Sequence, residues 1–412
     1  MAVRAQANDS DRSSPHEVVV IGAGYAGVIA ANRILSSRSL AERQTVRVTV
    51  VNPRTDFVQR IRLHEVMAGT AETASFPLTD ILHEDVELIA GTAIQIDPDA
   101  RLVDVEQDGA IHPVSYDMLV YAVGSQSAVA VPGVREHALP LGGSDEADRA
   151  RRTIAGLSAG SRVTVVGGGA TGVEAVTELA ERRPDLTLTL LTRGTVMANL
   201  SNTGQRNVRQ VLDRLGITVI QDSPVLSVEA GQLVLADGRR LAFDACIWTV
   251  GFTVPDLARR SGLATDGIGR LRLDATLTSI DSPHILGAGD AVALPDAVGA
   301  HLRMCCATAV PLGGHAADMV LATFRGTKLK PVSVGYGGQC ISLGRRYGLL
   351  QLLHADDTPR PIIIPGRAGA WVKERICRYS VTMMRNERRR PGAWLGVGGP
   401  RREPTPEPEY AR

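Results

Sequence analysis

Two stretches of the chain share one pattern of apolar and polar positions. Each has a β-branched apolar run, then a glycine-rich turn, then an alanine-rich segment with helical periodicity. In the first stretch we expect a strand over 17–21, a helix over 26–37 and a second strand over 46–51. The second stretch, VTVVGGGATGVEAVTEL, repeats the strand and helix pattern. A strand, a helix and a strand in this order are typical of a parallel sheet, so the sequence predicts an α/β fold.

The two turns carry glycines at one spacing, which suits a dinucleotide. The glycines are Gly22, Gly24 and Gly27 in the first turn and Gly167, Gly169 and Gly172 in the second. In such a turn the first glycine allows the sharp bend, the second lets the backbone approach a pyrophosphate, and the third lets helix and strand pack closely. The phosphates then meet the N-terminus of a helix. Two such turns indicate two bound dinucleotides, most simply a flavin and the nicotinamide nucleotide that reduces it.

The length of 412 residues accommodates two or three domains. We expect two Rossmann-like dinucleotide-binding domains with a small C-terminal α+β region. The predicted boundaries are a disordered leader over 1–15, an FAD-binding domain over 16–150 and 266–330, an NAD(P)-binding domain over 151–265, a C-terminal interface region over 331–395 and a disordered tail over 396–412.

Composition excludes several classes of function. Hydrophobic residues make up 44% and charged residues 22%, as in a soluble globular protein. The net charge of +1 offers no basic surplus for nucleic acid. No apolar run reaches the roughly 18 residues of a membrane span, and the N-terminal residues lack the apolar core of a signal peptide. We therefore predict a cytoplasmic protein.

The five cysteines include no CxxC or CxxxxC pair, which excludes the redox disulfide of thioredoxin-reductase-like enzymes. Cys305 and Cys306 are neighbours, and a bridge between neighbours requires strained geometry. We expect ordinary thiols throughout.

Polar residues follow the strand over 46–51. Asn52 stands where a Rossmann site usually has an acidic residue for the adenosine ribose, and Arg54 either pairs with a cofactor phosphate or is solvated. Farther on, Arg60, Arg62 and His64 alternate with apolar residues. Either they line one side of a segment near the flavin, or they form the polar face of a helix.

Five motifs follow one another in a fixed order. They are GxGxxG, YDMLVYAVG, a second GxGxxG, ACIWTVGFTVP and GAGD, in which Gly289 and Asp290 follow an apolar strand. Taken alone, Asp290 is better explained as a helix cap than as a flavin ligand. Independent coincidence of all five motifs is improbable.

This series resembles the two-dinucleotide-binding-domain flavoproteins, the pyridine-nucleotide-disulfide oxidoreductase class, over roughly residues 15–330. Within that class it is most similar to type II NADH dehydrogenases and apoptosis-inducing-factor-like quinone reductases. The narrower match rests on DFVQRIRLHEVMAGT, on ISLGRRYGLL and on the lack of redox cysteines.

The resemblance implies site residues at matching positions. FAD would be held by Gly22, Ala23, Gly24, Tyr25, Ala26, Gly27, Asn52, Pro53, Arg54, Arg60, Ala93, Ala122, Val123, Gly124, Gly289, Asp290 and Cys305, the last at the start of a helix aimed at the flavin. The nicotinamide nucleotide would be held by Gly167, Gly169, Ala170, Thr171, Gly172, Thr192, Arg193 and Gly251. Glu174 resembles the family glutamate beside nicotinamide and flavin; the alternative is a glutamate favoured only by the helix dipole.

The nucleotide preference depends on the end of the strand in LTLTLLTRG. Thr192 and Arg193 stand where an NADH site normally has an acid, and an arginine can bind the 2′-phosphate of NADPH. Gly172 favours NADH, because alanine there often accompanies NADPH use in this class. The cofactors are therefore FAD with NADPH or NADH, and the arginine favours NADPH.

The predicted acceptor site departs from the family. Pro311 and Leu312 occupy the places of the paired glutamines of type II dehydrogenases, which predicts a narrower, apolar pocket and makes ubiquinone doubtful. The sulfide:quinone oxidoreductase pattern needs two cysteines that bridge across the flavin. No cysteine precedes Cys246, so the sequence disfavours this class. The linker motif of Baeyer-Villiger monooxygenases is also absent.

The C-terminal region reads as three short strands, CISLGR, YGLLQLLH and RPIIIPG, and one basic helix. Its Trp371, Val372, Ile376, Tyr379 and Met383 are expected on one side. The helix either packs on its own domain or a dimer partner, or lies on a membrane surface.

These inferences predict an FAD-dependent NAD(P)H oxidoreductase that passes electrons to a quinone-like small molecule. Glu174, His64 and His301 are the expected proton donors near the flavin. No metal site is expected. Two alternatives stay open: a biosynthetic oxidoreductase acting on a specialised metabolite, and a redox-gated binding protein of the apoptosis-inducing-factor type.

Overall fold

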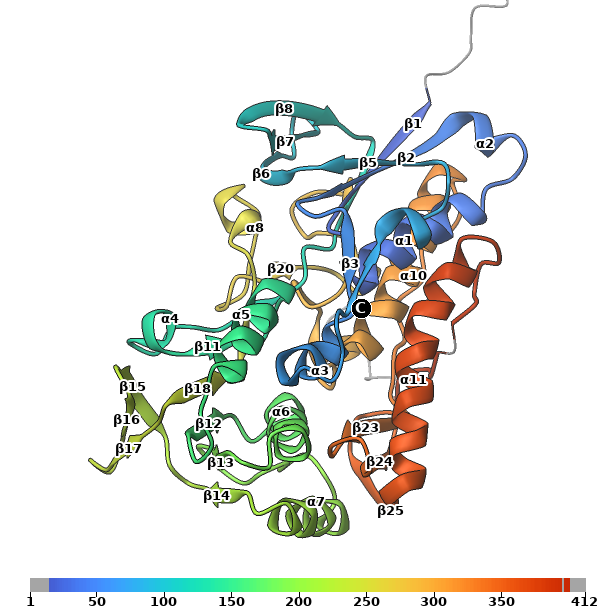
Figure 1. Cartoon of the computed structure of the whole chain (residues 1–412). Helices are drawn as coiled ribbons and strands as arrows, with labels where there is room; N and C mark the ends of the chain where they lie inside the picture. The colour runs from blue at the N-terminus through green and yellow to red at the C-terminus, as the bar shows by residue number, and fades with distance from the viewer. Residues whose placement is uncertain (1–14, 395, 401–412) are drawn as a thin grey trace, which may run out of the picture.

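The computed structural model describes residues 15–394 and 396–400. The predicted leader, except its last residue, and the predicted tail beyond residue 400 lie outside the described residues. The chain forms two α/β domains and a C-terminal region, whose helix α11 (Gly366–Glu387) runs along one side of the molecule (Figure 1).

The first domain is built on a five-stranded parallel sheet in the order β21-β9-β1-β2-β5. Its strands are β1 (His16–Ile21), β2 (Val46–Asn52), β5 (Val86–Ala90), β9 (Met118–Tyr121) and β21 (Ile285–Gly287). Val18 to Val20 in β1 are at most 1% exposed, because α1 (Tyr25–Ser36) and α10 (Cys306–Phe324) cover this sheet. Continuous apolar runs suit strands buried on both faces.

The second domain repeats this design in the order β11-β18-β12-β13-β14. Its strands are β11 (Leu139–Pro140), β12 (Arg162–Val166), β13 (Thr187–Leu191), β14 (Thr218–Ile220) and β18 (Ala245–Trp248), and its helices are α5 (Ser144–Ala155), α6 (Ala170–Arg182) and α7 (Asn202–Arg214). The outer strand β11 comes from the chain before residue 151, so this sheet begins earlier than the predicted boundary.

Smaller elements fill the connections. The short strands are β3 (Asp56–Val58), β4 (Ser75–Pro77), β6 (Thr92–Asp97), β7 (Leu102–Gln107), β8 (Ala110–Ser115), β10 (Gln126–Ser127), β15 (Val225–Glu229), β16 (Gln232–Leu235), β17 (Arg240–Ala242), β19 (Phe252–Thr253), β20 (Leu271–Arg272) and β22 (Val292–Ala293). The short helices are α2 (Glu42–Thr45), α3 (Leu63–Ala68), α4 (Val134–His137), α8 (Leu257–Arg260) and α9 (Asp296–Gly299), with 3₁₀ turns at Arg60–Arg62 and Leu78–Asp80.

The C-terminal region joins the two domains. Its antiparallel sheet consists of β23 (Gly338–Ser342), β24 (Gly348–Leu353) and β25 (Pro359–Pro365), as the three short apolar runs predict. Ile341 and Leu349 belong to the core of the second domain, whereas Val381 and Met384 of α11 belong to the core of the first. The region therefore fixes how the two domains face one another.

Two local expectations need correction. The predicted apolar side of α11 is divided, because Met383 is buried while Trp371 is 66% and Ile376 is 43% exposed. Of the two interpretations of Arg60, Arg62 and His64, the polar face of one helix is wrong, because the arginines lie on a 3₁₀ turn and His64 is buried on α3.

Candidate active site

In the first glycine turn, each of the three glycines has a different structural role. Gly22 has φ +101°, and a Cβ there would lie less than 3.0 Å from the carbonyl oxygen of Ala122. A Cβ on Gly27 would come closer still to the carbonyl oxygen of Gly22, whereas a Cβ on Gly24 would have no atom within 4 Å. The fold requires the outer two glycines, and the middle one faces open space beside the backbone.

The second turn repeats this geometry. Gly167 has φ +127°, and a Cβ there would lie less than 3.0 Å from Thr249 Oγ1. A Cβ on Gly172 would strike the carbonyl oxygen of Gly167, and a Cβ on Gly169 would have no neighbour within 4 Å. The open position again marks where a ligand can approach.

The helices after both turns begin without a side-chain cap. Gly24 is the N-cap of α1 and Gly169 is the N-cap of α6, and neither first turn contains an acidic residue. The free N–H groups and the positive end of each helix dipole suit an anionic ligand. Both turns therefore fit a dinucleotide pyrophosphate.

At the end of β2, the Asn52 side chain is engaged within the chain. Its Oδ1 accepts a hydrogen bond from Ala23 N (3.0 Å), and its Nδ2 donates to the carbonyl of Arg54 (2.6 Å). Arg54 Nη1 donates to Asp145 Oδ2 (2.8 Å), so it has an ion-pair partner in the chain. Asn52 thus fixes the turn as well as standing at the predicted ribose position.

Arg60 and Asp290 are brought together through Ser125. Arg60 Nη1 donates to Ser125 O and Oγ (both 3.0 Å), and Ser125 Oγ donates to Asp290 Oδ2 (2.6 Å). The other oxygen of Asp290, Oδ1, is buried and has no hydrogen-bond partner among the described residues. A buried acceptor without a donor fits a ligand hydroxyl such as those of the flavin ribityl chain.

Helix α10 begins beside this acceptor. Its N-cap Cys305 makes no side-chain capping bond to the helix backbone, although Cys305 Sγ lies 3.5 Å from Thr308 Oγ1. A Cβ on Gly289 would contact Ala26 of α1 and Ala309 of α10. The starts of α1 and α10 therefore converge at the GD motif.

A buried ion pair joins the second domain to the C-terminal helix. Glu174 Oε1 accepts from Lys373 Nζ (2.7 Å) and from Ser342 N (2.9 Å), and the two charged side chains are 8% and 12% exposed. His64 Nδ1 lies 3.9 Å from Glu174 Oε2, and the histidine is 3% exposed. The structure thus brings together Glu174 and His64, and adds Lys373.

Further charged side chains lie close to this pair. Arg345 Nε donates to Glu178 Oε2 (2.9 Å), its Nη1 lies 3.1 Å from Glu65 Oε1, and its Nη2 lies 3.4 Å from His64 Nε2. Arg62 Nη1 donates to Glu65 Oε1 (2.9 Å). These residues come from both domains and the C-terminal region, so the site forms only where the three parts meet.

Burial and charge set the protonation states. Burial lowers the pKa of His64 to about 4, although Glu174 opposes the shift, so the imidazole is neutral at pH 7. Burial acts to raise the pKa of Glu174, but Lys373 and His64 outweigh it and the pKa lies below its usual value. Burial acts to lower the pKa of Lys373, but Glu174 reverses the direction and the pKa is raised. The pair is therefore ionised at neutral pH.

The residues that follow β13 in the second domain differ from those at the end of β2 in the first. Thr192 is buried, and its side chain lies against Gly168, where a Cβ would come less than 3.0 Å from Thr192 Oγ1. Arg193 is exposed, and the structure describes no ion pair for it within 15–394 and 396–400. Gly251, with φ +70°, adjoins the half-exposed Phe252, over which the Arg60 guanidinium lies at 5.5 Å.

Other predicted residues lie apart from the charged pair. His301 Nε2 contacts the carbonyl oxygen of Val334 (2.7 Å), and no contact joins it to His64 or Glu174 within the described chain. Ala93 lies on β6, just beyond Gly91, whose N–H donates to the carbonyl of Asn52 (3.0 Å). Ala122, Val123 and Gly124 follow β9, and Gly124 has φ +70°.

Sequence reasoning missed Lys373, Arg345 and Ser125. Lys373 lies in a helix with many basic residues, and the sequence does not show which of them is buried. Ser125 follows the AVG motif directly, so its position next to the predicted flavin site was available from the sequence.

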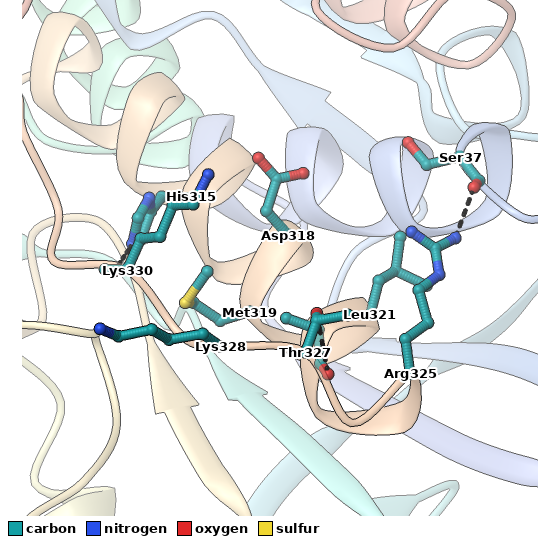
Figure 2. Close-up of a pocket in the computed structure, with 10 residues that line it drawn as sticks. Ser37, His315, Asp318, Met319, Leu321, Arg325, Thr327, Lys328 and Lys330 are labelled. Atoms are coloured by element: carbon teal, nitrogen blue, oxygen red, sulfur yellow. Dashed lines mark hydrogen bonds between the residues drawn. The ribbon is translucent and has the colours of Figure 1, made fainter.

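A separate cavity of about 360 Å³ lies beside Ser37, at the opposite end of α1 from its glycine N-cap (Figure 2). Arg325 Nη2 donates to the carbonyl of Ser37 (2.9 Å), and Asp318 is held by Arg33 Nε (2.7 Å). Because these groups are paired within the chain and the glycine turn is remote, this cavity is not part of the candidate site.

Within the described residues, no helix has the length and hydropathy needed to cross a bilayer, and no group of three or more potential ligands could hold a metal ion. All five cysteines are free thiols.

Comparison with known proteins agrees with this geometry. The model of the pyridine nucleotide-disulphide oxidoreductase family matches residues 16–310. An NADH dehydrogenase-like protein of Mycobacterium tuberculosis is 31% identical over 331 residues, covering 74% of this chain and 80% of the relative. A demethylphylloquinone reductase of Synechocystis is 25% identical over 342 residues, covering 79% and 84%. The structure of NDH2 from Plasmodium falciparum in complex with NADH superposes with a TM-score of 0.76 at 13% identity, covering 90% of this chain and 98% of that one.

Proposed function

This chain belongs to the pyridine nucleotide-disulphide oxidoreductase family, and on that premise we propose that it transfers hydride from a nicotinamide nucleotide to FAD and the electrons onward to a quinone-like acceptor. The observation that carries the proposal is the pair of glycine turns, each with an open middle glycine and an uncapped helix start. Bound FAD supplies a ring that accepts a hydride and releases electrons to a second substrate.

The first turn, Asp290 and the start of α10 would hold FAD. The unpaired Asp290 Oδ1 offers an acceptor to a ribityl hydroxyl, and Arg60 holds Ser125 and Asp290 in place. The second turn would hold the nicotinamide nucleotide, with Glu174 near its reactive end. The protein then contributes orientation, charge and exclusion of water, and needs no covalent nucleophile.

The acceptor is proposed to be a quinone-like molecule. The relative from Synechocystis is named for reducing demethylphylloquinone, which supports this class. Pro311 and Leu312 are both buried in α10, and their side chains have no group that could donate or accept a hydrogen bond.

NADPH is the proposed preferred donor. Arg193 is exposed after β13 and has no described ion pair, so its guanidinium is available to a 2′-phosphate. The M. tuberculosis relative is named for NADH, which makes a direct comparison of the two nucleotides necessary.

Peripheral membrane contact and dimer formation through α11 are further proposals. Trp371 is 66% exposed, and Arg375 and Arg378 are exposed on the same helix. Sedimentation with anionic vesicles and light scattering would test the two proposals separately.

The central experiment is anaerobic stopped-flow reduction of the purified protein by NADH and by NADPH, followed by mixing with menadione. We expect bleaching of the flavin band and rapid return of the oxidised spectrum on mixing. A protein that holds no flavin after gentle preparation or reconstitution would overturn the proposal. A change in dimerisation with negligible turnover would instead support the redox-gated binding protein.

A further inference from the structure

Lysine is rare in this chain, and two of its lysines lie together. Only three of the 45 lysine and arginine residues are lysines: Lys328, Lys330 and Lys373. Lys373 is buried in its ion pair with Glu174, whereas Lys328 and Lys330 are exposed and line the cavity of about 360 Å³ beside Ser37. An ammonium group is a compact point charge with three N–H donors, unlike the planar guanidinium of the other basic residues. The two exposed lysines of the chain therefore meet at one cavity.

The segment that carries both lysines is anchored on the first domain. Leu329, between the two lysines, packs against the hydrophobic core of that domain, while its neighbours line the cavity. His315 Nε2 of α10 contacts the carbonyl oxygen of Lys330 (2.9 Å). In Figure 2, Lys328 and Lys330 lie on the opposite side of the cavity from Arg325 and Ser37. The backbone contacts therefore fix where the two ammonium groups enter the cavity.

The other charged groups of the cavity are already paired. Asp318 accepts from Arg33 Nε and Nη2 (2.7 and 2.9 Å), and Arg325 donates to both carboxylate oxygens of Glu42 (2.7 and 2.8 Å). Within 15–394 and 396–400, the structure describes no hydrogen bond or ion pair for either ammonium group of the two cavity lysines. Because arginines neutralise both acids, the lysines leave the cavity with an excess of positive charge.

The helix ends at the cavity do not cancel this excess. Helices α1 and α10 both end here, and the C-terminal end of a helix carries a partial negative charge. Arg325 Nη2 donates to the carbonyl of Ser37 (2.9 Å), and Thr327 N donates to the carbonyl of Ala322 (2.9 Å). These carbonyl groups are therefore satisfied within the chain.

The cavity also offers an apolar wall and a suitable size. Met319 and Leu321, which are both buried, line it beside the lysines. Its volume of about 360 Å³ lies at the lower end of the range for small-molecule sites, about 300–1,000 Å³. A small molecule with an anionic group and a compact apolar part fits these surroundings.

We propose that this cavity binds a small molecule that carries a phosphate group, with Lys328 and Lys330 holding the phosphate and Met319 and Leu321 contacting the rest of the molecule. A phosphate monoester carries about −1.5 to −2 charges at pH 7, so it matches two ammonium groups better than a singly charged carboxylate does. The cavity lies at the opposite end of α1 from the first glycine turn, and none of its lining residues comes from the second domain. The site is therefore additional to both dinucleotide sites.

Acetylation of amines gives a site-specific test, because the chain has only three lysines. The full-length protein with its flavin is treated briefly with acetic anhydride, and mass spectrometry measures acetylation at each lysine. Phenyl phosphate is the probe, and phenyl sulfate, which has a single charge, is the matched control. Vesicles that contain phosphatidic acid present the same phosphate group on a lipid. The buried Lys373 is the internal reference, since its acetylation reports unfolding.

We expect saturating phenyl phosphate to slow acetylation of Lys328 and Lys330 by about fivefold or more and to leave Lys373 unchanged. Phenyl sulfate should protect only at concentrations about threefold higher or more. Vesicles with the same phosphate concentration should protect neither lysine, because a diacyl lipid is too large for the cavity. Lys330→Met should raise the phenyl phosphate concentration that half protects Lys328 by about threefold or more.

Arg272→Met is the matched control, because it removes the same charge from an exposed position on β20 and should leave half protection unchanged. Equal acetylation with and without phenyl phosphate would overturn the inference. Equal protection by phenyl sulfate would mean charge screening, and protection by vesicles alone would mean a membrane contact; either result would also overturn it. None of these measurements uses turnover, so the inference and the proposed function fail separately.

Discussion

In the first glycine turn the outer two positions must be glycine, because a Cβ would overlap the carbonyl oxygens of Ala122 and Gly22. In the second turn a Cβ would overlap Thr249 and Gly167 in the same way. The surroundings of the two turns differ. The first is closed by α10, whose Gly313 leaves no room for a Cβ against Ala26 of α1. The second adjoins Val250 and Phe252, which are 40% and 43% exposed, and Arg193, for which the described part of the chain provides no ion pair.

On the proposed function, this difference suits the two turns to different nucleotides. A closed turn with a buried unpaired acceptor at Asp290 suits a cofactor that stays bound. An open turn suits a nucleotide that must enter and leave in each catalytic cycle. One backbone design therefore serves both uses, and the elements packed around it decide which.

The largest expected effect is the loss of a bound cofactor, and it comes from alanine at the third glycine of each turn. Gly27→Ala and Gly172→Ala place a Cβ against a carbonyl oxygen, and overpacking of this kind costs about 1–3 kcal/mol. We expect Gly27→Ala to lose flavin on purification, and Gly172→Ala to stay yellow but to bind NADH at least about tenfold more weakly. The flavin-to-protein absorbance ratio and anaerobic nucleotide titration measure the two losses.

Gly267→Ala is the matched control, because a Cβ there has no neighbour within 4 Å and should change neither quantity. Loss of flavin from both turn variants alike would contradict the assignment of separate nucleotides to the two turns.

The next effect concerns the ion pair of Glu174 and Lys373, which joins the second domain to the C-terminal helix. Glu174→Gln leaves the Lys373 ammonium buried without its counter-charge, so the free energy of unfolding should fall by about 3–5 kcal/mol. Asp213→Asn removes a partner of the exposed Arg209 on α7 and should cost only about 0–1 kcal/mol. Urea denaturation followed by circular dichroism measures both, and equal losses would show that the Glu174 pair is not a buried one in solution.

The third effect is a pH dependence of stability from His64. Its pKa is about 4 in the folded protein, below the usual 6.5, because burial disfavours the charged ring. Between these values the unfolded chain binds one more proton, so the contribution of His64 is complete above pH 6.5 and declines as pH falls towards 4.

The slope is about 1.4 kcal/mol per pH unit, or about 3 kcal/mol in all. Urea denaturation at pH 7 and pH 5 should therefore show a smaller loss of stability in His64→Gln than in the natural protein. The exposed His354 offers the control His354→Gln, which should leave the natural pH dependence in place. An identical slope in the natural protein and His64→Gln would contradict the buried neutral imidazole.

Local pattern predicted the fold well and the meeting point of the domains poorly. The first strand, helix and strand agree within one residue with β1, α1 and β2, because apolar periodicity and glycine spacing are local properties. The family and its cofactors, FAD with a nicotinamide nucleotide, were also predicted from the ordered motifs and agree with the comparisons. The site residues proposed for these cofactors stay predictions.

The charged cluster could not be predicted in the same way. Glu174 and Lys373 are 199 positions apart along the chain, and their contact depends on how β23 and α11 pack across both domains. The exposed side of α11 was also misassigned, because Trp371 reads as apolar whether it faces a core or solvent. Long-range packing, which periodicity does not encode, decided both outcomes.

The smallest expected effect tests the open second turn. Arg193→Glu replaces an available guanidinium with a carboxylate that repels a 2′-phosphate and can accept from a ribose hydroxyl. A charged hydrogen bond is worth about 1.5–3 kcal/mol, so the ratio of kcat/KM for NADPH to that for NADH should fall by about tenfold or more. Arg206→Glu on α7 changes the charge equally at an exposed position and should leave the ratio unchanged. Because we propose that the flavin binds at the first turn, its absorbance spectrum should be the same in both variants. An unchanged ratio in Arg193→Glu would mean that the residue after β13 does not discriminate between NADPH and NADH. The two turns would then differ only in how accessible they are to a nucleotide.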